Sequence, residues 1–119
     1  QTVKQVWFCG MHTDVGGGYE EQELSNIPLL WMQDMAVKHG LIMYQKHTVS
    51  IEGNINGFMH NSREGFFGKF YRQKNRFWDS KRTDKPAVHN SVLQRLKNVN
   101  NEGNPTYSPW ILEAEYEVE

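Results

Sequence analysis

The sequence predicts an α/β fold, and three stretches carry this prediction. Val3–Cys9 is rich in β-branched and aromatic residues and has the composition of a buried strand. A glycine-rich loop over residues 11–23 follows it, and residues 25–40 then show the three- and four-residue apolar spacing of a helix. Strand, loop and helix in this order form an α/β unit. Helical spacing returns at residues 88–98.

The ends of the first two elements have recognisable signals. Gly10 ends the strand. Ser25 is a suitable N-cap for the helix, and Pro28 falls in the predicted first turn, where its missing N–H costs little. Gly40 suits the left-handed residue that ends a helix.

The middle of the chain is less regular. Residues 47–53 alternate weakly and predict a short strand, and residues 54–78 predict a long loop with one strand near Lys69–Arg72. In the second helical segment, Asn90 or Ser91 is the expected cap.

Bulk properties predict one unit over residues 1–119 that lies in the cytoplasm. The net charge of −1 gives no overall attraction to nucleic acid, and no nucleic-acid partner is expected. Cys9, the single cysteine, excludes an internal disulfide. The sequence shows no signal peptide and no apolar run near the ~20 residues of a membrane span. Because a strand pattern begins almost at once, we also expect the chain to be a piece of a longer protein.

Asp14 is the first candidate site residue. It follows the predicted strand, and catalytic groups of open α/β sheets gather beyond the carboxyl ends of strands. A carboxylate there can orient a histidine from a later loop, and the glycines at residues 16–18 allow another group to approach closely. The structural alternative is that Asp14 only accepts a hydrogen bond from its own loop.

His89 is the second candidate, because it directly precedes a predicted helix and can act as a base there. His12 lies two residues before Asp14, but the chain has no structural-zinc spacing, so we predict neither a metal nor another cofactor. The other histidines, among them His60, are interpreted as structural.

The stretch from Arg63 to Lys85 is both basic and aromatic. Eight Lys or Arg residues against three acids give it a charge of +5, with six aromatic residues between them. Such a stretch suits single-stranded nucleic acid or an anionic membrane surface, or it is a solvated loop held by its aromatics. The alternative function is therefore a non-catalytic interaction module.

A nucleophile for Asp14 and His89 is missing. None of the serines lies in a G-x-S-x-G elbow. In α/β-hydrolases the chain order is serine, acid, histidine. A chain that starts at the strand before the acid would have its serine upstream.

Two ordered segments resemble a large α/β-hydrolase family that includes the type VI secretion phospholipase effectors of the first lipase class. The first, "VKQVWFCGMHTDVGGGYEEQELSNIPLLWMQDMAVKHGL", is similar to the family's strand, its H-[ST]-D-V-G-G-G-Y loop and its L-S-x-I helix. The second, "VHNSVLQR" followed by "YSPWIL", is similar to its H-x-S-V-x-x-R and Y-x-P segments.

The resemblance implies the C-terminal part of an α/β-hydrolase, with Asp14 as triad acid and His89 as triad histidine. Family members hydrolyse esters, so the expected substrate is an ester or a phospholipid. The chain alone is expected to be inactive and to associate with the missing N-terminal half or with itself. Membrane contact and delivery by secretion are the further expectations.

Overall fold

The structure is a computed structural model, and the part of the chain it describes falls into two compact units. Residues 10–60 form the first, called the helical unit, and residues 1–9 with 61–119 form the second, called the sheet unit. Each unit is described by itself. The described residues are 3–43, 50–61, 78–79, 81–101 and 107–119.

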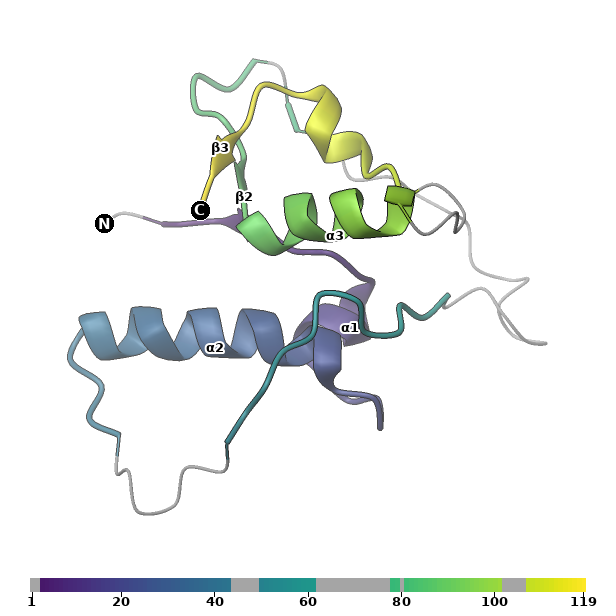
Figure 1. The fold of residues 1–119 in the computed structure, drawn as a ribbon. Coiled ribbons are helices and arrows are strands. Elements are labelled where there is room, and N and C mark those ends of the chain that lie inside the picture. The colour runs from purple at the N-terminus through teal and green to yellow at the C-terminus, as the bar shows by residue number, and fades with distance from the viewer. Residues whose placement is uncertain (1–2, 44–49, 62–77, 80, 102–106) are drawn as a thin grey trace, which may run out of the picture. The chain divides into compact units, whose positions relative to one another are not determined.

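The sheet unit contains three short parallel strands in the order β1-β2-β3 (Figure 1). They are β1 (Val6–Trp7), β2 (Ala87–Val88) and β3 (Glu117–Val118). Trp7 is opposite Val88, and Val88 is opposite Val118. The His89 N–H donates to the Trp7 carbonyl at 3.0 Å and extends the ladder. β2 is thus the central strand.

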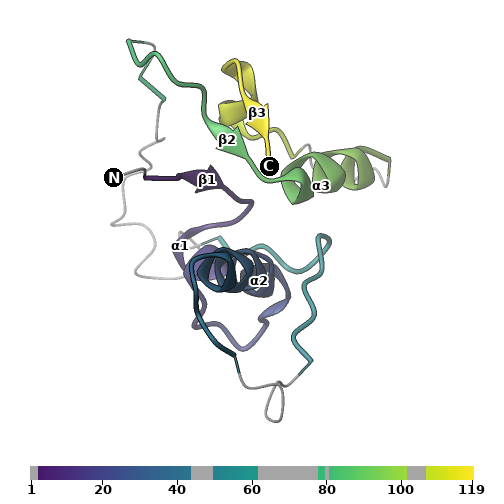
Figure 2. The same ribbon diagram turned by 90° about the vertical axis from the view of Figure 1, so that its left-hand side faces the viewer.

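The core of the sheet unit lies around β2 and the helix that follows it. α3 (Asn90–Asn101) starts two residues after β2 ends. Figure 2 shows the chain passing from β2 into α3. Val88 is fully buried, Val92 on α3 is 2% exposed and Ile111 is 4% exposed. Ile111 belongs to the 3₁₀ helix η3 (Trp110–Glu113). Burial of these side chains is the main stabilising term in a unit whose strands are only two residues long.

The helical unit contains α1 (His12–Gly16) and α2 (Glu23–Lys38), which contact each other (Figure 1). Residues 50–57 run back to the start of α2. The Asn54 N–H donates to the Glu23 carbonyl at 3.0 Å.

The α/β class predicted from the sequence is confirmed by the three-stranded parallel sheet and its helices. A strand lies within Val3–Cys9 as predicted, although only Val6–Trp7 forms the ladder. The prediction of an unbroken loop over residues 11–23 is wrong, because α1 occupies its first part. The short helix was hidden by the glycines that end it.

The predicted start of the long helix is also wrong. α2 begins at Glu23, so Ser25 lies inside it and its hydroxyl donates back to the Gln22 carbonyl at 3.1 Å. Pro28 therefore lies beyond the first turn, where its ring removes a helical N–H. The predicted end is confirmed: Gly40 has φ +98°, and its N–H donates to the Val37 carbonyl at 2.9 Å.

The remaining predicted elements have different outcomes. Residues 50–53 are described and are not a strand, while residues 47–49 and the strand expected near Lys69–Arg72 lie outside the described residues. The second helix is confirmed as α3. Of the helices in the described part of the chain, none has the length and apolarity that crossing a bilayer requires.

Candidate functional site

Asp14 is a buried carboxylate on α1. Its side chain is 1% exposed. It is the third residue of this helix, and its Oδ2 accepts a hydrogen bond from the N–H of Met11, the N-cap residue, at 3.0 Å. This is the backward half of a capping box, in which the third residue satisfies the N-cap donor. The local hydrogen bond expected in the structural alternative is therefore present.

Gly10 makes room for this carboxylate. Its φ is +113°, a backbone conformation that L side chains rarely adopt. A Cβ atom at this position would lie 2.5 Å from the Asp14 Cβ and 3.3 Å from its Oδ2. The sequence pattern indicated only that Gly10 ends a strand, so this close approach was missed.

The glycine triplet has a separate task. Gly16 is the last residue of α1, and the two that follow have φ values of +82° for Gly17 and +121° for Gly18. Neither conformation suits a residue with a side chain. The triplet therefore ends α1 and turns the chain within four residues of Asp14.

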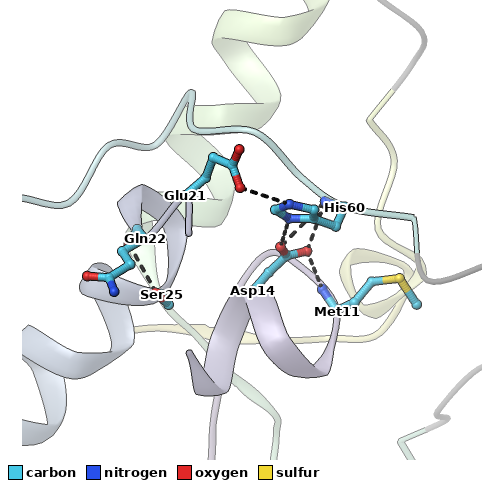
Figure 3. Close-up of polar contacts among 6 residues, drawn as sticks. All are labelled: Met11, Asp14, Glu21, Gln22, Ser25 and His60. Atoms are coloured by element: carbon cyan, nitrogen blue, oxygen red, sulfur yellow. Dashed lines mark hydrogen bonds and ion pairs between the residues drawn. The ribbon is translucent and has the colours of Figure 1, made fainter. Parts of the chain in front are cut away.

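His60 is the histidine that contacts Asp14 in the helical unit (Figure 3). Its Nδ1 lies 2.7 Å from the Asp14 Oδ1, and its backbone N–H donates to Oδ2 at 3.2 Å. An ionised carboxylate only accepts hydrogen bonds, so Nδ1 carries the proton in this contact. Sequence reasoning treated His60 as structural. The two positions lie 46 apart in the sequence, and no helical or strand period links positions so far apart.

The His60 ring is fixed on several sides. It stacks on Tyr19 with centroids 3.6 Å apart and an interplanar angle of 18°, and the Phe58 ring lies perpendicular to it with centroids 4.9 Å apart. Its Nε2 lies 3.4 Å from a Glu21 carboxylate oxygen (Figure 3). Two carboxylates, one buried and one exposed, thus face the two ring nitrogens.

His89 occupies a different environment in the sheet unit. It lies between β2 and α3 and stacks on Phe8 with centroids 4.7 Å apart. Its Nδ1 is 2.8 Å from the Ser91 hydroxyl and accepts the Ser91 N–H at 3.3 Å. The residue before the helix, rather than Asn90 or Ser91 as predicted, thus supplies the cap. Burial lowers the pKa of His89, and the charge of Glu119 partly opposes this effect.

The two predicted site residues belong to different units. Asp14 lies in the helical unit and His89 in the sheet unit, so their pairing stays a prediction. Among the described residues, no three His, Cys, Asp or Glu side chains are grouped to bind a metal ion.

The basic and aromatic stretch from Arg63 to Lys85 lies mostly outside the described residues. In its described part, Arg82 packs over the Trp78 ring at 4.3 Å and binds the Asp84 carboxylate at 2.8 and 2.9 Å. Lys85 lies 3.4 Å from a Glu115 carboxylate oxygen. These two cations therefore already have acidic partners within the chain.

The sheet and the Asp14–His60 contact define an α/β protein with a buried carboxylate–imidazole pair. Residues 1–35 match a family model described as "T6SS, Phospholipase effector Tle1-like, catalytic domain", where T6SS denotes the type VI secretion system. This match agrees with the family that the sequence resembles. It includes His12 and Asp14 and ends before His60 and His89. Comparison with curated proteins and with solved structures gave no significant match.

Proposed function

We propose that this chain is the acid-bearing part of a phospholipase-like serine ester hydrolase. The observation that supports this most strongly is the match of residues 1–35 to a phospholipase catalytic-domain model, because the buried Asp14 lies inside that segment. The nucleophilic serine belongs, in this proposal, to a part of the protein outside these 119 residues. The chain is then inactive alone and takes an ester or phospholipid substrate only in the complete enzyme, which is delivered by secretion.

The reaction in this proposal is acyl transfer through a serine. A histidine takes the serine proton during attack on the ester carbonyl and returns it to the leaving alcohol. Asp14 holds that imidazole in the required tautomer and stabilises the imidazolium that forms. We assign the histidine role to His89 because it follows β2, the neighbour of the strand that leads to Asp14.

The surroundings of His89 support this role and also set a condition on it. Its lowered pKa favours the neutral imidazole at neutral pH, the form that can accept a proton. Its Nδ1, however, accepts hydrogen bonds from Ser91. Pairing with Asp14 through Nδ1 requires this contact to be exchanged, with a proton moving onto Nδ1.

The direct test measures phospholipid hydrolysis by the complete protein. Asp14→Asn keeps the shape of the side chain but removes its charge, and it should lower turnover by about 10⁴-fold. His89→Asn should give a loss of similar size because it removes Nε2, the atom that accepts the serine proton. His39→Gln is the matched control, since His39 is an exposed residue at the end of α2. Full activity of Asp14→Asn would refute the proposal.

His12 requires its own variant in this series. It lies in the matched segment, two residues from Asp14 and on the same short helix. If His12→Asn abolishes turnover and His89→Asn does not, the histidine role moves from His89 to His12 while the hydrolase proposal stands.

We also propose that the sheet is completed by further strands, from the missing half of the protein or from a second copy. Three strands of two residues each form a small sheet, and an unpaired strand edge tends to recruit another chain. Light scattering tests this proposal: a monodisperse monomer of 119 residues would contradict it.

Binding to anionic vesicles tests the expected membrane contact, and binding without any hydrolase activity in the complete protein would favour the interaction module.

A further inference from the structure

Three hydrogen-bond donors fix the Asp14 carboxylate, and two of them come from His60. The Met11 N–H and the His60 N–H reach Oδ2 at 3.0 and 3.2 Å, and the His60 Nδ1 reaches Oδ1 at 2.7 Å. The carboxylate is nearly inaccessible to water, so these donors replace its hydration. The orientation of this buried carboxylate therefore depends on His60.

We propose that His60 is a positioning residue for Asp14, the acid of the proposed hydrolase site. This inference rests on the proposed function. The Nδ1–H of His60 holds one carboxylate oxygen, and in this proposal the remaining acceptor capacity of the carboxylate serves the histidine that exchanges protons with substrate. His60 itself does not touch the substrate.

The surroundings of His60 are those of a fixed hydrogen-bond donor. Stacking on Tyr19 and the perpendicular contact with Phe58 restrict rotation of the ring. A ring flip would place carbon Cδ2 where Nδ1 now meets Asp14, so the flipped ring would leave Oδ1 without its closest donor. Tyr19 belongs to the same glycine-rich segment as Asp14, so this segment supplies both the acid and the surface that orients its partner.

If the contact is only structural and attaches residues 50–60 to α1, a different result is expected. A purely structural contact tolerates any residue that keeps the fold. A positioning contact requires an N–H at the place of Nδ1, the ring nitrogen that is bonded to Cγ. Asparagine has an N–H at that place, whereas glutamine has its N–H at the place of Nε2. His60→Asn and His60→Gln are therefore matched variants that differ in where the donor lies.

The first measurement uses this chain and needs no activity. Nitrogen-15 NMR of the imidazole should show His60 with Nδ1 protonated at neutral pH, and Asp14→Asn should change its nitrogen shifts. A neutral His60 with the proton only on Nε2 would overturn the proposal, because Nδ1 could not then donate to the carboxylate.

The second measurement uses the complete enzyme. His60→Gln and His60→Ala should lower kcat by roughly 10–100-fold with little change in KM, and His60→Asn should recover most of kcat. Urea midpoints compare the folding of the three variants. Equal kcat for His60→Asn and His60→Gln would overturn the positioning role, whichever level they share. If Asp14→Asn is also fully active, the proposed function itself fails. If His60→Asn and His60→Gln have equal kcat but Asp14→Asn is inactive, the proposed function stands and only the positioning role is refuted.

Discussion

Replacing Gly10 by alanine should disrupt the Asp14 site from the backbone side. The alanine would have to adopt the φ of +113° that Gly10 has, and this conformation costs a residue with a side chain about 1–3 kcal/mol. It would also lie 2.5 Å from the Asp14 Cβ, an atom next to the backbone that cannot rotate away. α1 must then shift, and the contacts of the carboxylate with Met11 and His60 weaken at a cost of about 1–3 kcal/mol. The two costs together give an expected loss of about 2–6 kcal/mol.

The assay is urea unfolding, with two glycines of the same unit as controls. Gly40 has φ +98° but open space around it, so Gly40→Ala should show the backbone cost alone, about 1–2 kcal/mol. Gly16 has open space, and its φ lies outside the left-handed range, so Gly16→Ala should be neutral or stabilise by about 0.5 kcal/mol. If Gly10→Ala costs no more than Gly40→Ala, the close approach to Asp14 has no energetic weight and the reasoning is wrong.

Three further outcomes follow from burial and hydrogen bonding elsewhere in the two units. Val92→Ala should lower the free energy of unfolding by about 2 kcal/mol, whereas exposed Val3→Ala should change it by less than about 0.5 kcal/mol in the same urea series. Burial lowers the folded-state pKa of His89, so the stability that its neutral form contributes is complete above the ordinary pKa of about 6.5 and is lost as pH falls through the folded value. His89→Gln should therefore make the urea midpoint less dependent on pH between about pH 5 and 7. Asp14→Asn should lower stability by about 1–3 kcal/mol, because it replaces a carboxylate acceptor with an N–H next to existing donors, and thermal unfolding followed by circular dichroism measures this loss.

The α/β class could be predicted because it depends on local patterns. A few neighbouring residues are enough to recognise each signal: the β-branched and aromatic residues around Trp7, the apolar spacing of α2 and the glycine at position 40 that ends it. The start of α2 was misplaced because Ser25 and Pro28 give strong local signals that tertiary contacts override. The Asn54 N–H binds the Glu23 carbonyl and fixes the first turn from a distant loop.

The candidate site was predictable only in part. Asp14 could be proposed as a site residue because it follows a strand and precedes glycines, which is a local signal. Its contact with His60 depends on how a long, irregular segment returns to α1, and no periodicity carries that information. The role of Gly10 is likewise invisible in sequence, since a strand-ending glycine and a glycine that makes room for a carboxylate look the same.

The division of the chain has a consequence for how the protein folds during synthesis. The helical unit is one continuous stretch, residues 10–60, so it can fold while later residues are still in the ribosome. The sheet unit joins residues 1–9 to the far end of the sequence, and the Glu119 carbonyl accepts the first N–H of α3, from Asn90, at 2.9 Å. β1 therefore has no strand partner until Ala87 and Val88, the residues of β2, have been made. During that interval the Asp14–His60 contact can already exist, whereas the hydrogen bonds around His89 cannot.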